Sequence, residues 1–190
     1  IKIDSQGMDL KIINSLDEKY LSKVVALDVE PGFIPAYKGE DLFPSVHEFL
    51  VSKGFCLADL RSQKYPRVNA GSLREINSLL NISDENGIEP FLTSSPTAAE
   101  ARYLRTISSA AKCGEEQLLL LFIFSILCGH NGFAFDVKIE HEKKYEKNLN
   151  NEYISDFILN ILREQSFMPL WKYKFVKNII KRFPSIKRYL

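Results

Sequence analysis

Two acidic side chains stand where apolar, strand-like segments end. Asp4 follows residues 1–3, and Glu30 follows residues 24–29. In open α/β sheets, ligands bind beyond the carboxyl ends of the strands, because loops there present side chains without disturbing the core. If these two strands are neighbours, both carboxylates line one crevice. The sequence therefore predicts a polar site around Asp4 and Glu30.

The residues after Asp4 add further polar groups. Asp4, Ser5, Gln6 and Gly7 place a carboxylate, a hydroxyl and an amide near the start of a predicted helix. Asp9 falls in the first turn of that helix, where a negative charge is stabilised by the helix dipole. A structural interpretation stays equally open, in which Asp4 only caps the helix and the acid ending the next strand is solvated.

The apolar pattern predicts alternating strands and helices in residues 1–82. Strands are expected at 1–4, 24–29, 55–61 and 73–82, the second buried on both faces because it is almost wholly apolar. Helical spacing runs from residue 8 to residue 20, and a second helix is expected at 44–53, between Pro44 and Gly54. This alternation is typical of a layered α/β sheet.

After residue 82 the pattern changes, and residues 83–190 are predicted to form an all-helical extension. The expected helices lie at 97–112, 115–128, 132–147, 152–164 and 169–183. The apolar run at 118–128 is shorter than the about 20 residues that a membrane-spanning helix needs, so we expect a buried core helix there.

Several segments of residues 1–79 resemble, in order, the FkbM family of methyltransferases. The matching segments are IKIDSQGMDLKIINSL (1–16), VALDVE (25–30), FIPAYKG (33–39), LFPSVHEFLVSKGFCLADL (42–60) and LREINSL (73–79). The resemblance implies the C-terminal half of a Rossmann-like class I methyltransferase sheet. It also implies an S-adenosylmethionine-dependent O-methyltransferase that acts on a hydroxyl of a sugar, a glycan or a secondary metabolite.

The resemblance also implies roles for individual residues. It puts Asp4 beside the reacting centre with Gln6 and Asp9 in the same loop, and Asp4 and Ser5 next to the cofactor. Glu30 and Tyr37 are expected on the acceptor side. The acceptor hydroxyl would attack the sulfonium methyl in line, helped by positioning and by a general base.

The chain departs from the family pattern at three places. Asp9 stands where the family usually has glutamate, and Asn77 where an aspartate is expected in the last strand. None of the nine glycines forms the glycine-rich loop that cradles the cofactor in this fold, and the match begins at the family's fourth strand. We expect the cofactor-binding half to lie upstream of Ile1 and this chain alone to bind S-adenosylmethionine poorly or not at all. Whether the chain by itself is an enzyme therefore stays open.

The composition limits the classes of partner and of site that we expect. The formal charge is +1, which points away from a nucleic-acid partner. The charge is unevenly spread, because residues 165–190 hold seven of the 25 Lys and Arg residues and none of the 24 Asp and Glu residues. Three cysteines without a Cys-x-x-Cys pair favour the reducing cytoplasm. The three histidines are too widely spaced for a metal site, and none is expected.

The basic tail leaves two interpretations open. Apolar residues from Trp171 to Phe183 fall on one helical face, and lysines fall on another. Such a helix can lie on an anionic membrane, here through residues 169–190 at the inner face, or it can pack on the preceding helices. The alternative to an enzyme is thus a non-catalytic helical module for protein interaction or membrane docking. A half-sheet also exposes a strand edge that a second copy of the chain, in a homodimer, could cover.

Overall fold

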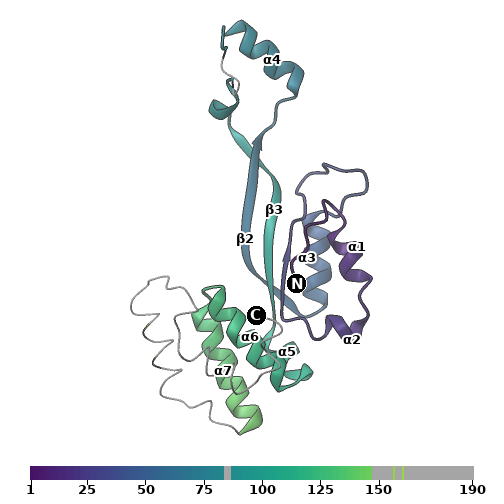
Figure 1. Ribbon diagram of the computed structural model, residues 1–190, viewed down its shortest axis with the longest axis vertical. Helices are drawn as coiled ribbons and strands as arrows, with labels where there is room; N and C mark the ends of the chain where they lie inside the picture. Colours follow the sequence, from purple (N-terminus) through teal and green to yellow (C-terminus); the bar gives the residue numbers. More distant parts are fainter. Residues whose placement is uncertain (84–86, 147–155, 157–159, 161–190) are drawn as a thin grey trace.

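The computed structural model describes residues 1–83, 87–146, 156 and 160. The described part is a mixed α/β structure, and Figure 1 shows a long hairpin with helices on both sides of its base. The elements are, in chain order, α1 (Asp9–Asn14), α2 (Glu18–Leu21), β1 (Ala26–Val29), α3 (Phe43–Ser52), β2 (Phe55–Pro66), α4 (Ala70–Leu79), the 3-10 turn η1 (Glu89–Phe91), β3 (Ser94–Arg105), α5 (Ile107–Cys113), α6 (Glu115–Leu127) and α7 (Asn131–Tyr145).

The three strands form an antiparallel sheet in the order β1-β3-β2. On its other edge, β1 pairs in parallel with the first residues of the chain at Lys2 and Asp28. The backbone N–H of Ile3 donates to the carbonyl of Asp28 at 2.9 Å, and the N–H of Asp28 donates to the carbonyl of Ile1 at 2.9 Å. Segments 1–4 and 24–29 are therefore neighbours, which was the condition for both carboxylates to line one crevice.

β3 corrects the prediction that residues 83–190 are helical throughout. Residues 97–105, predicted as the first part of a helix, belong to the central strand of the sheet, and only α5 at the end of 97–112 is helical. Alanine, glutamate and arginine favour helix, but pairing on both edges overrides that preference. In the structure this segment shows the two-residue alternation of a strand, since Ala99, Ala101 and Tyr103 are buried while Glu100 is exposed.

α4 corrects the predicted strand at 73–82. The side chain of Asn69 accepts a hydrogen bond from the backbone N–H of Ser72 at 2.8 Å and so caps the helix. Leu73 and Ile76 are half-buried at a three-residue spacing, which fits a helix. Asn77 therefore lies in a helix and not in the last strand of a sheet, and the resemblance of 73–79 does not extend to its conformation.

Two smaller expectations are also corrected. The helical spacing from residue 8 to residue 20 is divided into α1 and α2, because Asp17 ends the first part by capping the second. β1 is buried on one face only: Leu27 and Val29 are fully buried, whereas Asp28 is half-buried and pairs with Arg102 on the opposite face. The predicted helices at 44–53, 115–128 and 132–147 are confirmed by α3, α6 and α7.

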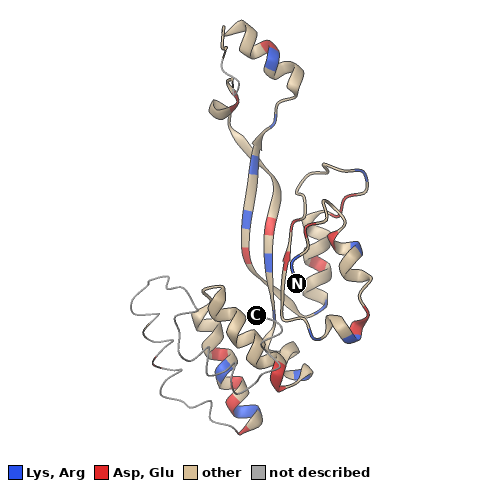
Figure 2. Ribbon diagram, in the orientation of Figure 1, with Lys and Arg blue, Asp and Glu red and all other residues tan. Residues whose placement is uncertain are grey.

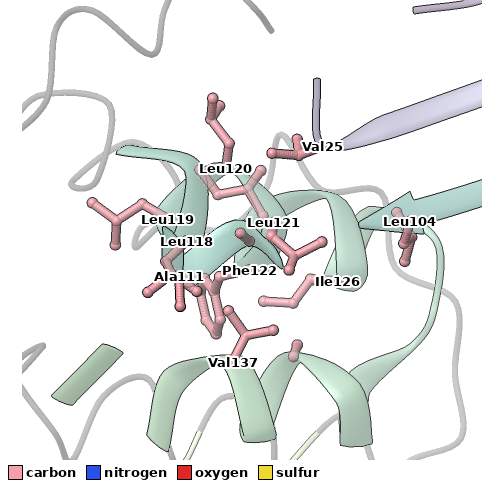
Figure 3. Packing of buried hydrophobic residues seen from close by; sticks show 13 residues of the cluster. Val25, Leu104, Ala111, Leu118, Leu119, Leu120, Leu121, Phe122, Ile126 and Val137 are labelled. Atoms are coloured by element: carbon pink, nitrogen blue, oxygen red, sulfur yellow. The ribbon is translucent and has the colours of Figure 1, made fainter. Parts of the chain in front are cut away.

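Two apolar clusters hold the fold together. One lies between α1, α3 and the sheet and includes Leu27, Val46 and Tyr103. The other joins α5, α6 and α7 to the base of the sheet, and Figure 3 shows the buried side chains of α6 between Val137 of α7 and Leu104 of β3. Apart from two glutamates in its first turn, α6 carries no charged residue, as Figure 2 shows. These clusters hold the two faces of the sheet at the base of the hairpin.

Within the described residues, no helix is both long and apolar enough to cross a membrane. The predicted helices at 152–164 and 169–183, and with them the basic amphipathic tail, lie outside the described residues apart from positions 156 and 160.

Candidate functional site

Asp9 joins the two strand ends at which the site was predicted. Its carboxylate is 1 % exposed and accepts hydrogen bonds from the backbone N–H of Glu30 at 2.7 Å and of Ser5 at 3.2 Å. The hydroxyl of Ser5 also donates to it. Aspartate is therefore long enough to hold both loops. Asp9 lies behind the site, where it positions the residues that face outward.

A second carboxylate shapes the loop that carries Tyr37. Glu40 Oε2 accepts from the backbone N–H groups of Ala36 at 2.5 Å and of Tyr37 at 3.0 Å. The aliphatic part of the Glu40 side chain lies so close to Gly7 that a Cβ atom at position 7 would be 2.8 Å from Glu40 Cγ. Gly7 also has φ +94°, a conformation that disfavours other residues. The loop at 33–40 is thereby fitted against the loop that follows Asp4.

Aromatic rings anchor the start of the same loop. The ring of Phe33 packs on Phe43 with centroids 5.4 Å apart, and Phe43 stacks on His47 at 5.5 Å. His47 Nδ1 lies 3.0 Å from the hydroxyl of Tyr103, which is fully buried in the sheet. Burial raises the pKa of Tyr103 to about 12, so its hydroxyl keeps its proton at neutral pH. The row of rings ties the loop to β3.

These loops and the hairpin enclose a cavity of about 460 Å³. Four of the predicted site residues line it together: Asp4, Gln6, Glu30 and Tyr37. The two others, Ser5 and Asp9, do not line it. The predicted crevice beyond the ends of segment 1–4 and β1 is therefore present, and its size falls in the range of about 300–1,000 Å³ that small-molecule sites occupy.

The charges of the cavity are mostly negative. Asp4 is exposed, and among the described residues no hydrogen bond or ion pair holds its carboxylate, although its charge also acts on Lys2. Glu30 is half-buried and pairs with Lys2 at 3.1 Å. The hydrogen bond from Lys2 to Glu30, together with the charge of Glu30, raises the pKa of Lys2. Asp4 is thus the carboxylate of the cavity that is best placed to act on a bound molecule.

The hairpin contributes residues that sequence patterns did not indicate. Gln63 and Tyr65 of β2 and Thr97 and Ala98 of β3 also line the cavity. Gln63 and Tyr65 lie beyond the strand expected at 55–61, and Thr97 was placed in a helix, so neither segment was expected near the site. The one sequence signal that relates Gln63 to Tyr65 is the alternation along a strand, which puts residues 63 and 65 on the same face of β2.

Metal ligation has no geometric support in the described part of the chain. No group of three or more His, Cys, Asp or Glu side chains there is arranged to hold an ion. The three cysteines are free thiols, and burial raises the pKa of both Cys56 and Cys128. The cavity offers a ligand the carboxylates of its acidic residues, the two amides of Gln6 and Gln63, and aromatic rings.

No family model, no curated protein and no solved structure matches this chain. The cavity and the resemblance of the early segments are the two grounds for a functional proposal.

Proposed function

We propose that the cavity is the acceptor site of an S-adenosylmethionine-dependent O-methyltransferase of the FkbM type, and that this chain forms the C-terminal half of its sheet with a helical extension. One observation carries the proposal: Asp4, Gln6, Glu30 and Tyr37, which the resemblance assigns to the reacting centre and the acceptor side, line one cavity. They come from three separate stretches of the chain, so their meeting is not a consequence of sequence proximity.

The order of the strands supports the same proposal. Segment 1–3 pairs in parallel with β1, and β3, the last strand, lies antiparallel between β1 and β2. In class I methyltransferases the last strand of the chain likewise inserts antiparallel between the two strands that precede it. The parallel pair beside an antiparallel strand supports the proposal that these are the later strands of such a sheet, with β3 in place of the strand that was expected at 73–82.

Each cavity residue has a task that its chemistry allows. Asp4 accepts a hydrogen bond from the acceptor hydroxyl and takes up its proton as the new C–O bond forms. Gln6 and Glu30 orient the acceptor through the amide and the second carboxylate. The ring of Tyr37, 50 % exposed, forms an apolar wall against the acceptor. Together these groups hold one hydroxyl in line with a methyl donor.

The residues present fit the proposed cofactor on its acceptor-facing side. S-adenosylmethionine supplies a methyl group on a positively charged sulfonium, and the cavity is lined by Asp4, Glu30 and Glu40, with opposite charge. Asp4, which lines the cavity, would face the sulfonium, and Ser5, which does not line the cavity, is the second residue that the resemblance puts next to the cofactor. The Ser5 hydroxyl donates its proton to Asp9, so its oxygen can accept a hydrogen bond from a ligand.

Calorimetric titration of the natural full-length protein with S-adenosylmethionine tests this assignment. We expect saturable binding that Asp4→Asn weakens about tenfold, because the neutral amide loses its attraction for the cation. Asp136→Asn is the control, because Asp136 is an exposed residue of α7 that does not line the cavity; it should leave the affinity unchanged. Absence of binding by the unmodified protein would contradict the proposal.

A further inference from the structure

The outer edge of β2 pairs with no strand in the described part of the chain. The sheet order β1-β3-β2 leaves β2 at one side, and no isolated bridge among the described residues involves it. Its residues from Leu60 to Tyr65 are all exposed. An unpaired edge presents free backbone N–H and C=O groups, which form a template for a further strand. β2 can therefore accept a strand from a partner.

The middle of β2 is the regular part of this edge. Two irregularities interrupt its pairing with β3, and one lies on each side of residues 59–63. The irregularity after Gln63 is a bulge, because Thr97 of β3 has no partner residue on β2. Within residues 59–63, every residue of β2 has its own partner on β3. Bulges turn an edge away from further pairing, so a strand can add most readily along the regular stretch between them.

The charges on this stretch are complementary to those of a second, antiparallel copy. Asp59 and Arg61 flank Leu60, so an antiparallel pair of β2 strands centred on Leu60 places each Asp59 opposite the partner's Arg61. Opposite charges directly across two strands stabilise the pairing, and like charges destabilise it. Within one copy these two side chains form an ion pair at 3.1 Å, with Arg61 73 % and Asp59 42 % exposed, so both remain accessible to a partner.

The same charges disfavour the neighbouring arrangements. Residues opposite each other in a sheet share a face, so two identical antiparallel strands are always centred on one residue and slip from it to the next. A centre at Asp59 or at Arg61 places two like charges face to face, and so does parallel pairing in register. A centre at Leu60 instead places an apolar side chain, 42 % exposed in one copy, against the same side chain of the other. Repulsion in the alternatives and attraction here select one register.

We propose that the protein forms a two-fold symmetric dimer in which β2 of one copy pairs antiparallel with β2 of the other, centred on Leu60. The two three-stranded sheets then form one continuous sheet across the axis. Backbone hydrogen bonds along the joined edge supply affinity, and the pairs between Asp59 and the partner's Arg61 supply the register. Because residues 59–61 do not line the 460 Å³ cavity, the dimer does not depend on the proposed function.

Sedimentation velocity of the natural full-length protein, over a series of concentrations, tests the charge pattern. We expect a dimer whose Kd rises about tenfold or more in Asp59→Arg, because two cations then face each other on each side of the axis. Adding Arg61→Asp to this variant makes the opposed charges opposite again, and should return the Kd to within about threefold of the original value.

Lys64→Glu is the matched control, a charge reversal at an exposed residue of β2 outside the central stretch, and it should leave the Kd unchanged. A monomer at every concentration would overturn the inference. A double variant that dissociates as readily as Asp59→Arg alone, or an equal effect of Lys64→Glu, would overturn it too.

Cysteine cross-linking locates the axis without any change of charge. In the proposed register the Cα of Leu60 lies about 5 Å from that of the partner's Leu60, within the range of a disulfide, whereas Ser62 lies at least about 13 Å from the partner's Ser62. Under oxidation, Leu60→Cys should therefore form a covalent dimer on a non-reducing gel, and Ser62→Cys and the unmodified protein should not. Equal cross-linking of the two variants, or none in Leu60→Cys, would contradict the register, whatever the charge variants do.

Discussion

At the scale of single residues, Asp9 is the group on which the geometry of the cavity depends most. Both of its carboxylate oxygens accept from backbone N–H groups, one from Ser5 and one from Glu30. Removing either bond would release a loop that carries a cavity residue. Its effect on the cavity is therefore indirect, through the positions of Asp4 and Glu30.

We predict that Asp9→Asn destabilises the protein by about 1–3 kcal/mol. An asparagine has one acceptor oxygen, so in either orientation its NH₂ group faces a backbone N–H that needs an acceptor. Asp41→Asn is the matched control: Asp41 accepts one bond, from the backbone N–H of Lys11 at 3.2 Å, which an asparagine oxygen can also accept. Urea unfolding measures both changes. Equal free energies of unfolding for the two variants would show that Asp9 does not join the loops.

Tyr103 gives the fold a predicted pH dependence. Its pKa is raised from 10.0 to about 12 by burial, so the unfolded chain loses this proton at lower pH than the folded protein does. The stabilisation is complete below pH 10 and is lost as the pH rises toward 12. Tyr103→Phe should cost about 1 kcal/mol at pH 8, because the bond to His47 is lost, but should lose less stability between pH 10 and 12.

Urea unfolding of both proteins at pH 9 and at pH 11 measures the difference. The other ionising groups of the two proteins are the same, so subtracting the two pH responses isolates Tyr103. Identical losses of stability in the wild type and in Tyr103→Phe would contradict the account of its burial.

At the scale of elements, the helices that the sequence predicts correctly are those in which the apolar residues are also the residues that the structure buries. α3 carries apolar residues at helical spacing, α6 is a continuous apolar run, and both are buried in a core, so pattern and structure coincide. The predicted helix at 97–112 and the predicted strand at 73–82 were wrong for opposite reasons. Residues 98–102 of β3 favour helix but are held extended by two neighbouring strands. α4 starts at a side-chain cap, Asn69, which the apolar pattern does not reveal.

The tip helix α4 should be the least stable of the longer elements. α3 and α4 each have ten residues, but α3 buries Val46 and Leu50 completely while no residue of α4 is buried among the described residues. Figure 1 shows α4 at the end of the hairpin, away from the apolar clusters. Because isolated helices of this length are marginal in water, we expect α4 amides to exchange hydrogen much faster than those of α3.

Hydrogen–deuterium exchange followed by mass spectrometry compares the two helices in one sample. The amides of α3 serve as the internal control, since both helices experience the same global unfolding. Protection of α4 as strong as that of α3 would contradict the description of the tip as a weakly supported element.

At the scale of the whole molecule, the sheet places the cavity between parts that are distant in sequence. The two carboxylates were predicted because strand ends can be read from apolar runs, and parallel neighbours bring Asp4 and Glu30 to one edge. The hairpin wall could not be predicted in this way. The positions of Gln63, Tyr65 and Thr97 depend on the register of β2 against β3 and on one bulge, and no local pattern encodes a register.

The central claim is that this cavity binds the hydroxyl acceptor of a methyl transfer in which Asp4 takes part. Transfer of tritiated methyl from S-adenosylmethionine to a panel of sugar, glycan and secondary-metabolite hydroxyls, by the natural full-length protein, tests it most directly. The account predicts transfer by the unmodified protein and by Asp136→Asn, and a loss of about 100-fold or more in kcat for Asp4→Asn with folding unchanged. Equal transfer by Asp4→Asn, or no transfer by the unmodified protein to any acceptor of the panel, would contradict it.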